Sequence, residues 1–153
     1  MSNITFNIAK GRVVELYNRV KSNDPTNAAL ILVPIETSGL EADATLIDAD
    51  TLAALLSGTT NEQTTMGRKV LTDTDLAALP APDDTNDRYD ISLPTTTWVA
   101  ATGNAISKIA VGYDPDTTGG TDANIIPLTM FDFAITPDGS DITMTGGEFF
   151  RAT

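Results

Sequence analysis

Apolar positions in the first third of the chain follow two different patterns. Between Ala9 and Lys21 the residues Val13, Leu16, Tyr17 and Val20 recur at spacings of three and four, which predicts a helix with one apolar face. Residues 28–35 (AALILVPI) are instead a continuous apolar run between turn residues, which predicts a strand buried on both faces at the centre of the core. Because proline has no N–H to donate, this strand is expected to end, bulge or reach a sheet edge at Pro34.

Capping and turn residues divide the next part of the chain. Asp48 precedes the apolar Leu52, Leu55 and Leu56, and Gly58 follows at the position of a left-handed C-terminal residue, which predicts a short helix. Residues 66–71 predict a strand. The Thr72 to Asp75 segment has a capping-box pattern that opens one turn of helix ending at Leu79. Residues 80–88 hold two prolines and several polar turn formers, so they predict an exposed loop.

The second half of the chain is a series of short segments rich in Thr, Val, Ile and aromatic residues, separated by Gly, Pro, Asn and Asp. These segments predict strands at 89–93, 95–101, 106–113, 125–133 and 140–144. Their even spacing indicates a mainly β fold, an antiparallel β-sandwich or barrel with two or three short α-helices in the N-terminal half. The length of 153 residues is typical of a single domain, in which residues 1–8 form either a short strand or an N-terminal arm.

Composition argues against an enzyme. The chain is 41% hydrophobic and 20% charged, which is ordinary for a folded domain, but it contains neither cysteine nor histidine. The absence of these two residues removes disulfides, thiolate metal sites, the commonest general base and the serine–histidine triad. No phosphate-binding glycine loop and no Gly-x-Ser-x-Gly elbow occurs either. We therefore expect a protein that is not an enzyme and needs no cofactor.

The charge of the chain is strongly negative and unevenly distributed. The net charge is −12, and from Val70 onward thirteen acidic residues face only three basic ones. Such a surface repels phosphate backbones, so we expect no direct nucleic-acid binding. Most basic residues lie in the first half, where Arg12 and Arg19 could contact an acidic partner or the acidic half of another copy. The alternative is that they are solvated charges on a helix face.

Acidic loops are the richest candidates for a metal site. Asp114, Asp116 and Asp122 lie around Gly119 and Gly120, and carboxylates with threonine hydroxyls could bind calcium. The spacing is not that of an EF-hand, and Asp and Gly also serve turn geometry, which is the interpretation we favour. The acidic groups at 83–87 and 138–141 raise the same question. Because Trp98 is the only large aromatic platform, a sugar cleft is disfavoured.

Neither a leader nor a membrane anchor is evident in the sequence. The N-terminus lacks a charged region followed by an apolar run, which argues against a signal peptide. The longest apolar stretch, residues 28–35, is far shorter than the roughly 20 residues that a membrane-spanning helix requires. We expect synthesis in the cytoplasm and no membrane contact.

Four stretches resemble small virion proteins encoded beside the capsid genes of tailed bacteriophages. They are residues 11–20 (GRVVELYNRV), 60–69 (TNEQTTMGRK), 80–89 (PAPDDTNDRY) and 122–130 (DANIIPLTM). The resemblance covers nearly the full length of the chain and carries no catalytic residue. It implies a virion component that is synthesised in the host cytoplasm and binds the major capsid protein or other virion proteins.

The leading hypothesis is a capsid decoration or cement protein that binds the head surface as an oligomer. Its contacts are expected at the chain ends and at the basic helix. The candidate interface residues are Phe149, Phe150 and Arg151, together with Phe6, Arg12 and Arg19. The alternatives are a tail, neck or fibre component and, from another class, a calcium-dependent carbohydrate-binding or adhesion module.

Overall fold

Strands dominate the computed structural model, which describes residues 3–153. Strands make up 34% of the chain and helices 16%, so the predicted mainly β class is confirmed. The strands are β1 (Ile4–Thr5), β2 (Ala29–Glu36), β3 (Lys69–Leu71), β4 (Tyr89–Leu93), β5 (Thr96–Trp98), β6 (Ile106–Asp114), β7 (Ile126–Ile135), β8 (Ile142–Met144) and β9 (Gly147–Ala152). The helices are the 3-10 turn η1 (Asn7–Ala9) and α1 (Val13–Lys21), α2 (Asp43–Leu46), α3 (Leu52–Leu55) and α4 (Asp73–Leu76). All of these helices lie in the N-terminal half, as predicted, although they outnumber the two or three expected.

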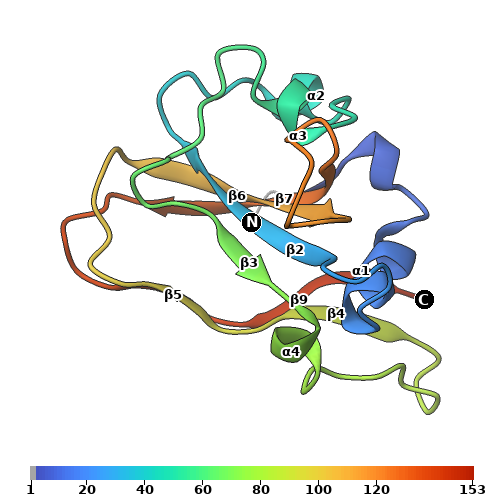
Figure 1. Ribbon diagram of the computed structural model, residues 1–153. Helices are drawn as coiled ribbons and strands as arrows, with labels where there is room; N and C mark the ends of the chain where they lie inside the picture. The colour runs from blue at the N-terminus through green and yellow to red at the C-terminus, as the bar shows by residue number, and fades with distance from the viewer. Residues whose placement is uncertain (1–2) are drawn as a thin grey trace.

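The strands form two layers (Figure 1). The first layer is an antiparallel sheet of five strands in the order β1-β7-β6-β2-β3. The second is a bent ribbon in which β4 pairs with β9 and, further along, β5 pairs with β8. Helices α2 and α3 lie at the outer side of the large sheet, and α1 lies at one end, between the two layers (Figure 1). The arrangement is β-sandwich-like, which agrees with the predicted architecture.

β2 occupies the predicted place in the core. Seven of its eight residues are buried, and it pairs with β6 on one side and β3 on the other. The strand continues through Pro34, which is opposite Ile109 of β6, but β3 pairs only as far as Leu32. A register shift follows between Ile35 and Glu36. The register shift is the bulge expected near Pro34, whereas no edge occurs there, because the Gln63 N–H donates to the Pro34 carbonyl oxygen at 2.9 Å and Ile35 bridges to Glu62.

The N-terminal helix is shorter than the predicted Ala9–Lys21. Gly11 has a φ of +82°, in the left-handed region, and it separates η1 from α1. The apolar face of α1 is confirmed, because Val13, Leu16, Tyr17 and Val20 are all buried. Glycine at this position therefore moves the start of the α-helix to Val13.

The short helix after Asp48 begins and ends at residues other than those predicted. The cap is Thr51, whose Oγ1 accepts a hydrogen bond from the Ala54 N–H at 3.0 Å, while the Asp48 carboxylate accepts one from the Asn7 side chain. Gly58 does not adopt a positive φ, and α3 ends at Leu55, with Leu56 as its C-cap. Both predicted caps are therefore wrong, and the Asp48 carboxylate is used in a contact with the N-terminal segment.

For the remaining helices and strands, the predicted and observed residue ranges differ mainly at their ends. The capping box is confirmed, since the Thr72 N–H donates to the Asp75 carboxylate at 2.8 Å, but α4 ends at Leu76 instead of Leu79. The β3 strand starts only at Lys69, and the final strand β9 was not predicted. Within residues 3–153, no helix has the length and apolar character needed to cross a membrane.

Candidate functional site

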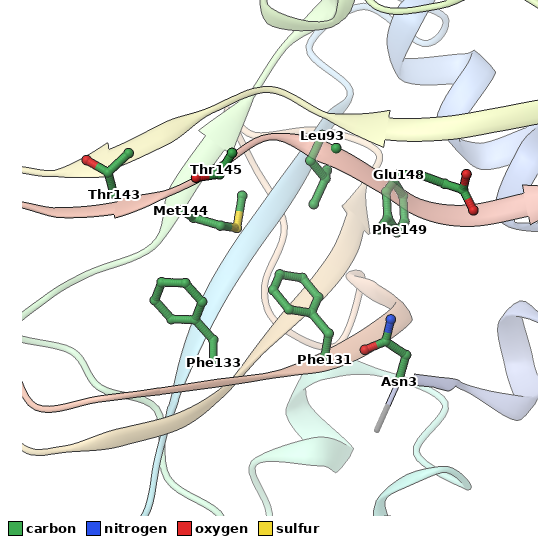
Figure 2. A pocket seen from close by; sticks show the side chains of 10 residues that line it. Asn3, Leu93, Phe131, Phe133, Thr143, Met144, Thr145, Glu148 and Phe149 are labelled. Atoms are coloured by element: carbon green, nitrogen blue, oxygen red, sulfur yellow. The ribbon is translucent and has the colours of Figure 1, made fainter. Parts of the chain in front are cut away.

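An apolar cleft opens between the two layers of the sandwich. It has a volume of about 310 Å³, and its apolar lining comes from Leu93, Phe131, Phe133, Met144 and Phe149. Figure 2 shows Phe131 and Phe133 pointing from β7 toward Met144 and Phe149 of the ribbon. Asn3, Thr143, Thr145, Gly147 and Glu148 complete the lining. The cleft therefore offers mainly apolar contact, with polar groups among its lining.

Each wall of the cleft includes a strand with one edge to which no other strand within residues 3–153 is paired. β1 pairs with β7 only at Thr129 and Met130, so no strand within residues 3–153 covers residues 131–135 on that side. In the ribbon, β8 and β9 pair only with β5 and β4, which leaves their other edge without a partner strand in the described part of the chain. An unpaired edge carries backbone N–H and C=O groups that can bind another strand.

Two adjacent glycines shape the ribbon wall in opposite ways. A Cβ on Gly146 would lie 2.5 Å from the Thr95 nitrogen and 2.7 Å from the Leu93 oxygen, so the ribbon bends at Gly146 without room for a side chain. A Cβ on Gly147 would meet no atom within 4 Å. Because Gly147 is directly opposite Leu93, which lines the cleft, a side chain at Gly147 would point into the cleft. Gly147 therefore keeps part of the cleft open.

A register shift in β9 explains the positions of the two predicted interface phenylalanines. Phe150 is opposite Ile91 and Glu148 is opposite Ser92, which leaves Phe149 as an extra residue. Both phenylalanines are half-buried against their own core, and Phe149 packs on Tyr17 with ring centroids 6.3 Å apart. Only Phe149 lines the cleft.

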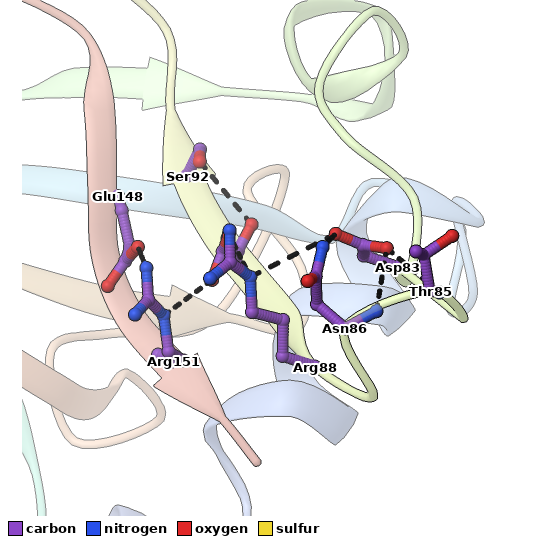
Figure 3. Close-up of polar contacts among 8 residues, drawn as sticks. Asp83, Thr85, Asn86, Arg88, Ser92, Glu148 and Arg151 are labelled. Atoms are coloured by element: carbon purple, nitrogen blue, oxygen red, sulfur yellow. Dashed lines mark hydrogen bonds and ion pairs between the residues drawn. The ribbon is translucent and has the colours of Figure 1, made fainter.

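The third predicted residue of this segment, Arg151, belongs to a polar network across β4 and β9 (Figure 3). Its guanidinium lies 2.7 Å from the Asp90 carboxylate and 2.6 Å from that of Glu148. Both carboxylates raise the pKa of Arg151 above its ordinary value. Arg88 lies 3.1 Å from the other oxygen of Asp90. This network stabilises the pairing of β4 with β9. The charge of Arg151 is therefore already paired with carboxylates of its own chain.

Phe6, Arg12 and Arg19 do not contribute to the cleft. Phe6 is completely buried, so it is a core residue and its predicted place at an interface is wrong; its backbone N–H donates to Leu128 of β7. Arg12 is the N-cap residue of α1 and Arg19 lies in its last turn, and they approach Glu15 at 4.0 and 3.1 Å. Arg12 is part-exposed and Arg19 is exposed.

The structure does not bring the three predicted calcium ligands together. The Asp114 carboxylate accepts the N–H of Asp116, and that of Asp116 accepts the N–H and hydroxyl of Thr118, which lowers the pKa of Asp116. Asp122 instead forms a two-point ion pair with Arg68 at 2.7 and 2.8 Å, which lowers the pKa of Asp122. No set of three or more Asp or Glu residues within 3–153 is arranged to hold a metal ion.

The other acidic loops have the same construction. Asp83 accepts the backbone N–H groups of Thr85 and Asn86, and Asp138 accepts the N–H and hydroxyl of Ser140. Figure 3 shows the first of these turns beside the ribbon network. The Asn86 side-chain amide also donates to Asp83, at 2.7 Å, and is the main cause of the lowered pKa of Asp83. The Ser140 hydroxyl is the main cause of the lowered pKa of Asp138. The aspartates therefore support turn geometry, which is the interpretation favoured by the sequence.

The cleft was not found from the sequence, apart from Phe149. Its other apolar residues lie on strands that had been predicted, and the alternation of Phe131, Asp132 and Phe133 was the available signal for two cleft-facing side chains. One wall comes from β7, and the other comes from β8 and β9 after the 136–141 turn together with Leu93 of β4, so only the tertiary structure unites them.

Comparisons with family models, with curated proteins and with solved structures found no match to this chain.

Proposed function

We propose that the protein is a structural component of a tailed-bacteriophage virion, a capsid decoration or cement protein that stabilises the head through protein–protein contacts. The observation that carries the proposal is the open apolar cleft between two strand edges that no strand within residues 3–153 pairs with. Such a cleft suits the binding of another protein, because unpaired backbone groups and an apolar pocket are the two parts of strand-addition sites. The resemblance of four sequence stretches to small phage virion proteins supplies the biological setting.

The electrostatics of the chain favour a protein partner over a nucleic acid. Six of the nine basic side chains lie in ion pairs with the chain's own carboxylates, namely Arg12, Arg19, Arg68, Arg88, Lys108 and Arg151. These six side chains therefore form no free basic patch on a chain whose net charge is −12. A phosphate backbone would be repelled, whereas a basic protein surface would be attracted.

The proposal is tested on purified particles of the phage that encodes this chain. Quantitative mass spectrometry should find the protein in hundreds of copies for each particle, and a cryo-EM map should place it on the outer surface of the head. Particles that lack the protein should release their DNA at a lower temperature than complete particles. A handful of copies located at the tail or neck would overturn the decoration role in favour of the tail alternative. Absence of the protein from the particle would overturn both.

A further inference from the structure

The turn between β7 and β8 contains Asp138 followed by Gly139, which is the one Asp-Gly pair in the sequence. From the contacts of this pair we infer that the turn is a site of spontaneous aspartate isomerisation, and that hydrogen bonds from Ser140 and to Ala101 hold it in an unreactive form. In the product, isoaspartate, the main chain runs through the side chain of residue 138.

The reaction needs only these two residues and water. The backbone nitrogen of Gly139 attacks the side-chain carboxyl carbon of Asp138 in its protonated form, and the carboxyl hydroxyl leaves as water with the amide proton. Water then opens the resulting five-membered succinimide at either of its two carbonyl carbons, which gives aspartate or isoaspartate. Glycine favours the attack because no side chain lies beside its nitrogen. Both residues are exposed, so water reaches them.

The Asp138 side chain is held by the residue beyond Gly139. One carboxylate oxygen accepts the backbone N–H of Ser140, at 3.0 Å, and also the Ser140 hydroxyl. The hydroxyl contact keeps the carboxyl group ionised, because it lowers the pKa of Asp138. An ionised carboxylate has no hydroxyl to lose as water, so the attack by Gly139 is slowed.

The backbone of the turn is held by the loop between β5 and β6. The Gly139 N–H, which carries the attacking nitrogen, donates to the Ala101 carbonyl oxygen at 2.7 Å. The Ala101 N–H donates in return to the Ser140 carbonyl oxygen at 2.9 Å, and Ala101 is buried. Ring closure requires rotation of the peptide group between Asp138 and Gly139, which breaks the first of these bonds. The pair therefore reacts only when the turn opens locally.

Isomerisation at residue 138 would change the connection between two strands that line the cleft. Isoaspartate adds one carbon atom to the main chain between β7 and β8. Phe133 of β7 and Met144 of β8 point toward one another across the cleft (Figure 2). Protection of the turn therefore preserves the geometry of the cleft while the folded protein ages.

The experiment is prolonged incubation of the purified full-length protein in warm neutral buffer, with isoaspartate located by peptide mapping and electron-transfer fragmentation. In urea, residue 138 should form isoaspartate faster than any other aspartate. The folded protein should react there roughly tenfold more slowly or less, because reaction requires local opening. Ser140→Ala should raise the folded rate roughly three- to tenfold, the factor that corresponds to one hydrogen bond, and should leave the rate in urea unchanged.

Two further variants separate the roles of the residues. Ser140→Thr keeps the hydroxyl and should react at the wild-type rate. Thr118→Ala is the matched control, because the Thr118 N–H and hydroxyl contact Asp116 in the same way. Asp116 is followed by Thr117, whose branched side chain hinders the backbone nitrogen, so this variant should form no isoaspartate at residue 116.

Two sets of results would overturn the inference. Equal rates in the folded protein and in urea, or an unchanged folded rate in Ser140→Ala, would show that the contacts do not protect the turn. Formation of isoaspartate mainly at another residue in urea would show that the turn is not the reactive site. Both measurements use the isolated protein, so their outcome is independent of the proposed function.

Discussion

At the scale of single residues, one buried tyrosine joins the N-terminal helix to the ribbon. Tyr17 of α1 is 1% exposed, and its hydroxyl donates to the Ser92 carbonyl oxygen of β4 at 3.0 Å. This hydrogen bond joins the helix to the ribbon across 75 positions of the chain. Burial, with a smaller effect of Tyr89, raises the pKa of Tyr17 to about 12.

The raised pKa of Tyr17 predicts a loss of stability in alkali. Tyr17 ionises near pH 10.0 in the unfolded chain and near pH 12 in the folded chain. The stability that neutral Tyr17 gives to the folded state is therefore complete below pH 10.0 and is lost as the pH rises from 10.0 to about 12. Tyr17→Phe should cost about 1 kcal/mol at neutral pH through loss of the hydrogen bond. It should also lose less stability than the wild type on going to high pH.

Urea unfolding of both proteins on either side of the ordinary tyrosine pKa measures this difference. Burial also raises the pKa values of Tyr89 and Tyr113, which remain in the variant, so the difference between the two proteins isolates Tyr17. Equal losses in alkali would contradict the assignment.

At the scale of elements, the sequence indicates strands and helices better than it indicates their ends. The apolar run that became β2 and the α1 face were predictable because burial of a periodic pattern is a local property of the sequence. The cap at Thr51 was not predicted, since Asp48 is also a common capping residue type, and its tertiary contact with Asn7 is not visible in the sequence. The β9 strand was missed because two glycines and a bulge interrupt its alternation.

The two glycines before and within β9 predict a sharp difference between neighbouring substitutions. Gly146→Ala should destabilise the protein by about 1–3 kcal/mol, because its Cβ would contact backbone atoms of Thr95, Leu93 and Pro94 that cannot move without opening the ribbon. Gly147→Ala should change stability by less than about 0.5 kcal/mol, because its Cβ meets no atom.

Chemical unfolding of the two alanine variants beside the wild type measures both effects. Because the substitution is the same and the positions are adjacent, each variant serves as the control for the other. Equal destabilisation by the two would show that the bend at Gly146 does not require a glycine.

At the scale of the whole molecule, the candidate site emerged from topology. The sequence correctly favoured turn geometry for the acidic loops, and it included Phe149, but the cleft needs β7 and the β8–β9 segment on facing layers. No local pattern reports which strands face each other. Arg12 and Arg19 were expected at an interface because basic side chains could contact an acidic partner, and the structure places both near the carboxylate of Glu15.

The net charge predicts how salt changes the stability of the folded chain. With −12 charges on 153 residues, repulsion between carboxylates opposes the compact state, and salt screens it over a distance of about 8–10 Å at physiological ionic strength. The thermal unfolding temperature should therefore rise with sodium chloride from low to physiological concentration. Calorimetric scans across this range measure the shift, and a fall would indicate that the ion pairs contribute more than the repulsion costs.

The edge of β7 to which no strand within residues 3–153 is paired has a consequence for the protein before it meets any partner. An open edge pairs with any exposed strand, including that of a partly folded neighbour, and is therefore a starting point for aggregation. Asp132 lies in the middle of this edge and is held by Lys108, whose side chain is nearly buried, at 2.6 Å. A fixed charge there discourages flat stacking of like strands while the cleft face stays apolar.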